Sequence, residues 1–405
     1  MTEDAAIADL TGGLSAILPS ANCDWNRADG IAYLAKRLAL KPGDLVALFI
    51  SPLADAYRIA RQAERAFPGI TVIGCTTAGE ISAEGYASGQ IVAVGLPSQH
   101  FSCATVVVPD LAEFDQHQLA YEILSARSDL SRQRPGWDTE FAFTLIDGLS
   151  LREDEWAAAL AMTLGPMPVF GGSAGDDIEF HQAFVLHQGA VLRNAAVLTL
   201  VRSACEVRVF KFDHLLPTHL QMVVTGANPA ARIVHEINAE PAGRELARIL
   251  GKDPYQLSQM TFAAHPVLVR IGNQHHVRAI QRVTEDGNLV FFSAIGEGVV
   301  LTLAEAAPIA DHLEQELATL TRARKPAAIL GFDCVLRRVE AEQLQLNVRM
   351  SEILRKHGVV GFNTYGEQIS GMHVNQTFTG VAIYPPESHS HDQCDHTPHA
   401  DQSQR

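Results

Sequence analysis

The stretch GFNTYGEQISGMHVNQTFTGVAIY, Gly361–Tyr384, resembles two segments earlier in the same chain. The three related segments are VIGCTTAGEI (Val72–Ile81), VFGGSAGDDI (Val169–Ile178) and VVGFNTYGEQI (Val359–Ile369). Each begins with a short apolar run and continues through a glycine and small polar residues to a carboxylate. A pattern that recurs within one chain indicates a repeated structural unit, and we call these three segments the glycine turns.

A strand–helix–strand pattern precedes each glycine turn. Apolar runs without alternation predict strands that are buried on both faces, and apolar residues at helical spacing predict the helices between them. In the first repeat we expect a strand at 44–51, a helix at 55–67 and a strand at 70–74. In the second and third repeats we expect strands at 140–147, 168–172, 327–332 and 359–361, with helices at 152–164 and 340–356. The spacing within the first two repeats, about 30 residues, is that of a βαβ unit.

The fold class that follows is α/β, with two domains whose mixed sheets are built from repeated strand–helix–strand–glycine-turn units. We predict an N-terminal extension over residues 1–28, an α/β domain over 29–224, a second α/β domain over 225–385 and a disordered His-rich tail over 386–405. Within the second domain we expect helices at 231–238, 241–250 and 303–320, and strands at 267–271, 276–283 and 289–293. Asp286–Gly287 predicts a hairpin turn.

The amino-acid composition and net charge argue against some classes of binding partner. The chain has 405 residues, of which 47% are hydrophobic and 19% charged, as in globular proteins. A net charge of −15 argues against nucleic acid as the main partner. We find neither a secretory signal nor the run of about 20 apolar residues needed for membrane insertion. The six cysteines are scattered singly, which is typical of a reducing compartment, so we expect a cytoplasmic protein.

The glycine turns form the first candidate site. In open α/β sheets ligands bind outside the carboxyl ends of strands, and glycines let the backbone approach a ligand closely. The ligand pocket that this predicts would be rimmed by Thr76, Thr77, Glu80, Ser173, Asp176, Asp177, Asn363, Tyr365 and Glu367. The alternative is that the glycines only form tight turns whose backbone groups the hydroxyls satisfy. A phosphate cradle is disfavoured, because each turn ends in a carboxylate.

His373 and Asn375 distinguish the third segment from the other two. A neutral imidazole at His373 could bind a metal or haem iron, and the alternative is a histidine that pins the turn to the last strand. The pair His275–His276 lies in a probable hairpin and is expected at the surface. Four further histidines have no partner at metal-ligand spacing: His214, His219, His235 and His265.

Arg270 and Arg278 flank the same hairpin and could bind the acidic group of a ligand or the carboxylates of the turns. Surface ion pairs are the alternative. The sequence contains no nucleophile elbow, no SxxK pair and no cysteine in an activating context. We therefore predict that the protein is not an enzyme.

The three glycine turns and several segments in the second half of the chain together resemble the FIST family of sensory proteins, which have a FIST N and a FIST C domain. The resemblance covers roughly residues 30–385 and is carried by GCTTAGEI, GGSAGDD, VRAIQRV, FFSAIGEGVVLTLA and GFNTYGEQISGMHVNQT. The second-domain segments are most similar to the NosP subgroup, which are nitric-oxide-sensing haemoproteins.

The resemblance to NosP implies a sensor that binds haem b and detects nitric oxide. It further implies a role in two-component regulation and biofilm behaviour, through a partner histidine kinase or a diguanylate cyclase or phosphodiesterase. Carried onto this chain, His373 is the candidate axial ligand, with His235 and His265 in reserve. The other candidate haem-binding residues are Asn363, Tyr365 and Asn375. The alternative is a FIST sensor of a non-haem ligand such as an amino acid, whose carboxylate Arg270 or Arg278 would bind.

Overall fold

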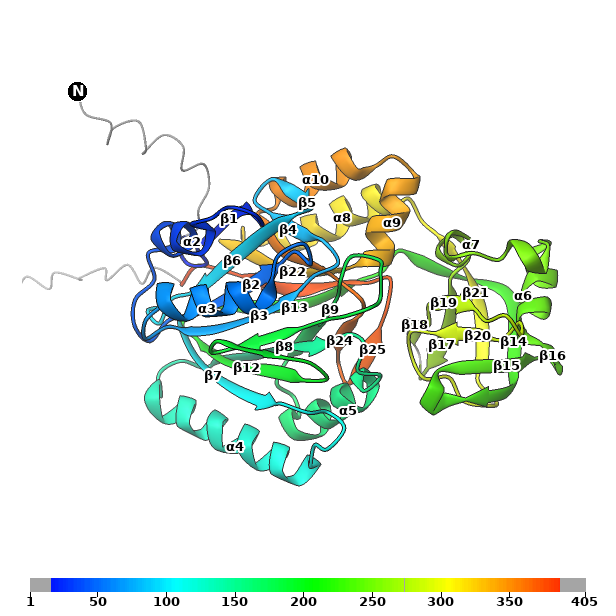
Figure 1. Cartoon of the computed structure of the whole chain (residues 1–405), viewed down its shortest axis with the longest axis horizontal. Coiled ribbons are helices and arrows are strands. Elements are labelled where there is room, and N and C mark those ends of the chain that lie inside the picture. Colours follow the sequence, from blue (N-terminus) through cyan, green and yellow to red (C-terminus); the bar gives the residue numbers. More distant parts are fainter. Residues whose placement is uncertain (1–15, 273, 387–405) are drawn as a thin grey trace, which may run out of the picture.

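The computed structural model describes residues 16–272 and 274–386 (Figure 1). We call residues 16–214 and 307–386 the body, and residues 215–306 the module. Mixed α/β sheets make up the body, which confirms the predicted fold class. The predicted tail from residue 387 onward and residues 1–15 of the predicted extension lie outside the described residues.

The body consists of three units with the same order of elements. The first contains β1 (Ser20–Asp24), α2 (Gly30–Leu38), β2 (Leu45–Ile50), α3 (Ala56–Ala66), β3 (Thr71–Thr76), β4 (Glu80–Ser82), β5 (Gly85–Ala87) and β6 (Gln90–Leu96). The second contains β7 (Phe101–Val108), α4 (Gln116–Gln133), β8 (Thr139–Asp147), α5 (Glu153–Leu164), β9 (Val169–Ala174), β10 (Val185–His187), β11 (Ala190–Leu192) and β12 (Ala196–Ser203). The third contains β13 (Val207–Phe212), α8 (Ile309–Thr321), β22 (Ala328–Cys334), α9 (Val335–Gln343), α10 (Asn347–Lys356), β23 (Val359–Thr364), β24 (Glu367–Ile369), β25 (Met372–Val374) and β26 (Phe378–Ile383).

Each unit builds one six-stranded sheet and gives its hairpin to another unit. The sheet orders are β1-β6-β2-β3-β10-β11, β25-β24-β9-β8-β12-β7 and β13-β26-β22-β23-β4-β5. Within a unit the two strands before the glycine turn pair in parallel: β2 with β3, β8 with β9 and β22 with β23. The hairpin after each turn then pairs with the next sheet: β4 with β23, β24 with β9 and β10 with β3. The three glycine turns are therefore the points where the units interlock.

One apolar core lies between the three sheets, and three others lie between each sheet and its helices. Phe49, Phe332 and Phe362 come from the first and third units and stack in the central core, where the rings of Phe49 and Phe362 are 4.7 Å apart. Phe170 of the second unit packs against Phe332 at 5.1 Å. Helices α2 and α3, α4 and α5, and α8 to α10 cover the outer faces (Figure 1). This arrangement places the turns near the centre of the body.

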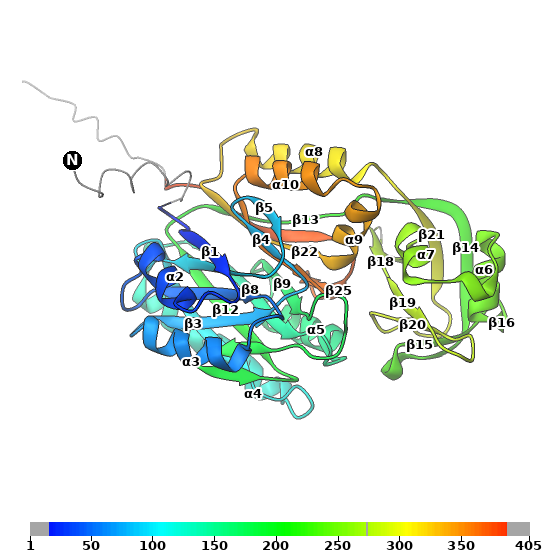
Figure 2. The ribbon, with the colours of Figure 1, turned by 45° about the horizontal axis from the view of Figure 1, so that its top comes forward.

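The module is inserted into the third unit, between β13 and α8. It contains β14 (Leu215–Asn228), η2 (Pro229–Ala231), β15 (Ile233–Ile237), β16 (Glu240–Pro241), α6 (Ala242–Leu250), η3 (Pro254–Gln256), α7 (Gln259–Ala264), β17 (Val267–Ile271), β18 (Gln274–Val277), β19 (Ile280–Val283), β20 (Leu289–Phe291) and β21 (Val300–Ala306). Its strands are antiparallel in the order β18-β17-β21-β14-β15-β20-β19, with β16 paired to β15. The module has its own apolar core and lies to one side of the body in both ribbon views (Figures 1 and 2).

Several predicted elements of the second half differ from the structure. The helix predicted at 231–238 is wrong, because 233–237 is strand β15; its buried residues Val234 and Ile237 are three apart and imitate helical spacing. The helix predicted at 303–320 is strand β21 followed by α8, and Pro308 immediately precedes that helix. The helix predicted at 340–356 is two helices, α9 and α10, and Gln345 between them has a φ of 58°.

Smaller differences concern strands and domain limits. The strand predicted at 276–283 is two strands, β18 and β19, at opposite ends of the module's sheet. Helix α4 was not predicted. The predicted N-terminal extension contributes β1 to the first sheet. The predicted boundary between residues 224 and 225 lies inside strand β14, because the module is an insertion into the third unit.

Candidate functional site

The three glycine turns bond to one another through their backbones. Turn one and turn three exchange two hydrogen bonds, from Ala78 N to Asn363 O at 2.9 Å and from Asn363 N to Gly79 O at 2.7 Å. Turn three and turn two do the same, from Tyr365 N to Ser173 O at 3.2 Å and from Ser173 N to Gly366 O at 2.9 Å. The interlocking leaves little of the turn backbone free to bind a ligand.

Turn two completes the ring by bonding back to turn one. Gly175 N donates to Thr76 O at 3.1 Å, and Asp177 N donates to Thr77 O at 3.1 Å. A closed ring of this kind positions three strand ends with respect to one another. The glycines of the turns therefore serve the packing of the three units.

Two of the turn carboxylates are satisfied by hydroxyl groups of their own segments. Thr77 donates to Glu80 at 2.6 Å, and Gln90 N donates to the other carboxylate oxygen at 3.0 Å. In the third turn Glu367 accepts hydrogen bonds from Thr364 and, at 2.5 Å, from Thr377. Burial raises the pKa of Glu80 to about 7 and that of Glu367 to about 8. These two glutamates are internal parts of the turns.

Tyr365 and Asp176 join the third turn to the second. The Tyr365 hydroxyl donates to Asp176, whose other carboxylate oxygen accepts from the amides of His181 at 2.9 Å and Gln182 at 2.8 Å. The Tyr365 ring stacks on Phe180 with the centroids 4.3 Å apart. Burial raises the pKa of the Tyr365 hydroxyl, as does its hydrogen bond to Asp176. The tyrosine acts here as a cross-link between two turns.

Small cavities reach only some of the predicted turn residues. A cavity of about 340 Å³ is lined by Glu80, Asp176 and Asp177 among others, and a neighbouring one of about 180 Å³ is lined by Thr76 and Asp176. The remaining residues of the predicted rim, which line none of the five cavities that we describe, are Thr77, Ser173, Asn363, Tyr365 and Glu367. The structure thus brings the predicted residues together, mostly as partners of one another.

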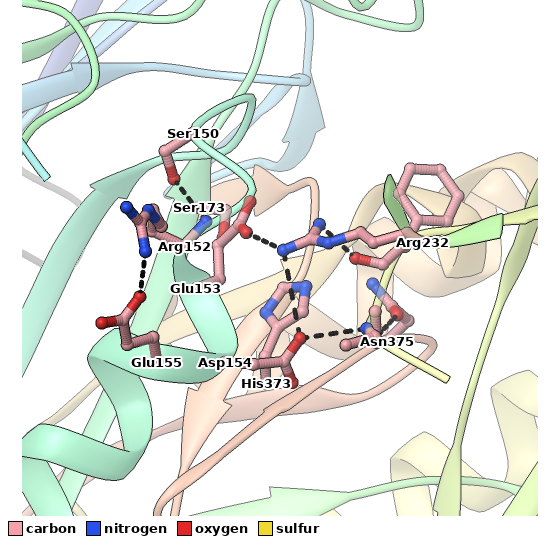
Figure 3. Close-up of polar contacts among 12 residues, drawn as sticks. Ser150, Arg152, Glu153, Asp154, Glu155, Ser173, Arg232, His373 and Asn375 are labelled. Atoms are coloured by element: carbon pink, nitrogen blue, oxygen red, sulfur yellow. Dashed lines mark hydrogen bonds and ion pairs between the residues drawn. The ribbon is translucent and has the colours of Figure 1, made fainter. Parts of the chain in front are cut away.

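His373 lies at the boundary between the body and the module (Figure 3). Its Nδ1 is 3.1 Å from Gln368 Nε2, and its ring packs so closely on Gly366 that a Cβ there would lie 2.3 Å from His373 Cε1. Burial lowers the pKa of His373 to about 4, so the imidazole is neutral at pH 7. His373 lines none of the five cavities, and Asn375 beside it donates to Tyr365 O at 3.1 Å.

An ion pair that the sequence did not reveal lies beside His373. Arg232 of the module donates to Glu153, the first residue of α5, and both side chains are buried (Figure 3). Arg232 also donates to Phe292 O at 2.5 Å, and its Nη2 lies 3.9 Å from Asp154 Oδ2. Burial raises the pKa of Glu153 to about 7, while Arg232 counteracts this rise. Arg232 belongs to no recognisable motif. It follows the short 3-10 helix Pro229–Ala231, and its own φ is 57°.

The two predicted arginines lie in different surroundings. Arg278 is buried and donates to the backbone oxygen of His373 at 3.1 Å, so it belongs to the contact between module and body. Arg270 is exposed and donates to Gly272 O at 3.0 Å. The two reserve histidines, His235 and His265, line none of the five cavities.

The largest of the five cavities, about 600 Å³, lies between the body and the module. Its size is within the roughly 300–1,000 Å³ of small-ligand and cofactor pockets. Elements of both parts form the wall, which consists of Pro168, Val169, Val209, Phe210, Lys211, Asp213, Leu215, Pro217, His275, His276, Ile369, Ser370 and Met372. The His275–His276 pair was expected at the surface, whereas both histidines line this cavity.

His276 is the most unusual member of this wall. It is 3% exposed, and its Nδ1 is buried with no hydrogen-bond partner among the described residues. Burial lowers the pKa of His276 to about 4, and the nearby cations Lys211 and Arg278 lower it further. A buried polar atom without a partner is costly in a folded protein, so this imidazole is a candidate to bind a ligand. Its position on edge strand β18 could not be read from the sequence.

Neither a membrane-spanning helix nor a cluster of metal ligands occurs in the part of the chain that the structure describes. The described residues contain no helix that is long and apolar enough to cross a membrane. They also contain no group of three or more His, Cys, Asp or Glu residues placed to hold a metal ion.

Two domain families match this chain, one after the other. Residues 44–240 match the FIST N domain and residues 242–370 match the FIST C domain, so the two matches together cover most of the chain. An uncharacterized protein of Methanocaldococcus jannaschii is 23% identical over 351 residues, which are 76% of this chain and 67% of that protein. FIST domains are sensory domains that bind small ligands. The chain therefore belongs to the FIST family of signal-transduction sensors, with a FIST N domain followed by a FIST C domain.

Proposed function

We propose that this protein is a haem-based sensor of nitric oxide whose haem b occupies the cavity between the body and the module. The observation that carries the proposal is that His276, whose buried Nδ1 has no hydrogen-bond partner among the described residues, lines that cavity. The proposal moves the candidate axial ligand from His373 to His276. His373 packs against Gly366 and lines none of the five cavities, whereas His276 lines the largest one.

The residues of the cavity suit haem by their chemistry. Val169, Phe210 and Ile369 give an apolar surface for a macrocycle. Imidazole and thioether groups are the common axial ligands of haem iron, and the wall contains His276 and Met372. The low pKa of His276 keeps the imidazole neutral, which is the form that binds a metal.

The polar part of the wall suits the haem propionates. Lys211 lies on the cavity and forms an ion pair with Asp213 at 3.1 Å. An ammonium group in the wall of a pocket can pair with a carboxylate of the ligand. His276 would hold the iron and Lys211 would orient the macrocycle. The bound haem would supply a ferrous iron that binds nitric oxide.

Signal output requires that the two ligand states favour different conformations of the protein. The cavity wall includes His276 of the module and Val169 and Met372 of the body, so its occupant contacts both parts. A partner that binds the two conformations with different affinity then reads the signal. We propose a histidine kinase or a cyclic-di-GMP enzyme as this partner, on the strength of the resemblance to NosP. A cytoplasmic location is supported by the free thiols of Cys23, Cys75, Cys103, Cys205 and Cys334.

A spectroscopic titration tests the proposal. Purified protein is titrated with haem b under reducing conditions, and its absorption spectrum is recorded before and after nitric oxide is added. We expect a saturable Soret band that shifts with nitric oxide. A protein that leaves haem free in solution contradicts the proposal. A parallel thermal-shift screen with amino acids covers the non-haem alternative, because a ligand at 100 times its Kd raises stability by about 2.7 kcal/mol.

A further inference from the structure

The module joins the body through two adjacent crossings of the chain. One crossing runs from β13 into β14 at residues 213–215, and the other runs from β21 towards α8 at residues 306–308. Leu215 pairs with Ala306, and Ala307 N donates to His214 O at 2.8 Å. We call residues 213–215 and 306–308 the hinge. Two strands that pair where they cross form a narrow connection about which a domain can rotate.

The hinge is fixed to the body by a buried polar network. His214 Nε2 is 2.9 Å from Glu340, and its Nδ1 is 2.8 Å from Arg337. Arg337 in turn donates to Asp333 at 2.7 Å. All four side chains are buried. The network holds one end of the module in place. A second set of contacts holds the other end.

The second set of contacts, which we call the latch, lies near His373 (Figure 3). Arg232 of the module forms the buried ion pair with Glu153 of α5. The amide of Ala294 donates to Asp154 at 3.2 Å, and Arg278 donates to His373 O at 3.1 Å. The latch is defined by these six residues. Every one of these contacts joins the module to the body through polar groups.

The hydrophobic cores of the two parts are separate. The apolar cluster of the module draws its buried residues from 222–303, and those of the body come from other segments. A small cluster at the hinge contains Leu215, Leu268, Val277 and Ala304. Outside the latch the ring of Phe292 of the module packs on Phe180 of the body with the centroids 5.6 Å apart, but among the described residues the two parts share no apolar core. Interfaces inside a chain that are not large and hydrophobic permit relative motion of the domains. Opening the latch would therefore leave both apolar cores packed.

We infer that the Arg232–Glu153 ion pair is a releasable latch that holds the module closed over the interdomain cavity. When the pair separates, the module turns about the hinge and exposes the surface of α5 that the latch covers. For this step the latch needs no ligand. The further statement, that the occupant of the cavity biases the latch, rests on the proposed function, because His276 and Met372 would contact that occupant from the two sides.

Hydrogen–deuterium exchange of the full-length, ligand-free protein tests the latch. Arg232→Met removes the charge from the module side, and Glu153→Gln removes it from the body side while keeping the size of the side chain. Arg248→Met is the matched control, because Arg248 pairs with Glu245 within the module. We expect peptides that contain Ala294 or residues 153–156 to exchange at least about tenfold faster in both latch variants. Arg248→Met and peptides from β9 should exchange as in the wild type.

Two results would overturn the latch. One is unchanged exchange around Ala294 in Glu153→Gln, and the other is faster exchange throughout the body and the module together. If Arg232→Met fails to fold, Glu153→Gln decides alone. The ligand arm adds haem b to the wild type: altered exchange at the latch supports coupling, and unchanged exchange with saturated haem overturns coupling. Failure to bind haem would contradict the proposed function and leave the ligand-free result standing.

Discussion

At the scale of single residues, the same pairing of a threonine with a glutamate recurs in two turns. Thr77 bonds to Glu80 and Thr364 bonds to Glu367, each pair at a spacing of three residues. Each glutamate accepts one further hydrogen bond from the start of the last strand of its unit, from Gln90 N or Thr377. A buried carboxyl group with several donors keeps its position even where burial opposes ionisation. The repeated Thr–Glu pair therefore serves first to hold the conformation of the turn.

The raised pKa of Glu367 predicts how stability depends on pH. The folded pKa of about 8 lies above the ordinary value of 4.5, so the folded state binds this proton more tightly. The stability that Glu367 contributes is full below about pH 4.5 and is lost as the pH rises towards 8. In Glu367→Gln this loss should be absent. From about pH 5 to about pH 8 the free energy of unfolding of the variant should gain about 1 kcal/mol or more on that of the wild type.

Urea denaturation at the two pH values measures this difference, and Glu245→Gln is a control in which the pKa is lowered by Arg248. A difference between Glu367→Gln and the wild type that does not change with pH would contradict the assignment.

The sequence predicted that the turn residues lie together, but it did not predict the cavity between the body and the module. Glycine, hydroxyl and carboxylate residues at fixed spacing identified Thr77, Glu80 and Glu367 as a group, because these contacts are local. The wall around His276 could not be predicted, because it combines strands from both halves of the chain. Likewise, Arg232 and Glu153 are 79 positions apart and neither belongs to a recognisable motif.

At the scale of secondary-structure elements, the exchange of hairpins makes the three units depend on one another. Each hairpin after a glycine turn completes a sheet that belongs to another unit. Strand–helix–strand segments were predictable, because apolar runs and helical spacing are local signals. The partner of each hairpin was not, since pairing over more than a hundred residues leaves no periodic signal in the chain. The short strand β15 was wrongly predicted as a helix for a related reason, because its two buried residues imitate helical spacing.

Close packing of the parallel strands predicts a severe effect at Gly361. A Cβ at this position would lie 1.8 Å from Gly331 O on the neighbouring strand β22, so the backbone would have to shift. We expect Gly361→Ala to lower the free energy of unfolding by about 3 kcal/mol. The control is Gly136→Ala, where no atom lies within 4 Å of the new Cβ, and a change within about 0.5 kcal/mol is expected. Equal effects of the two substitutions in chemical denaturation would contradict this account of the parallel pair.

At the scale of the whole molecule, a body of three interlocked units carries a module that is joined to it at the hinge. The central phenylalanines and the interlocked turns bind the three units into one structure. The module contributes part of the cavity wall and half of the latch, so a ligand in the cavity contacts the two parts that can move. The sequence showed two domains but placed their boundary inside β14, because an insertion into a repeated unit cannot be seen from local pattern.

The Soret spectra of four proteins titrated with haem b decide which histidine holds the iron: the wild type, His276→Ala, His373→Ala and His235→Ala. His235 is exposed on the module and is the matched control. We expect that His276→Ala alone loses haem or shifts the Soret band, while the wild type, His373→Ala and His235→Ala share one spectrum. A spectrum changed by His373→Ala and unchanged by His276→Ala would overturn His276 as the axial ligand and return that role to the third glycine turn.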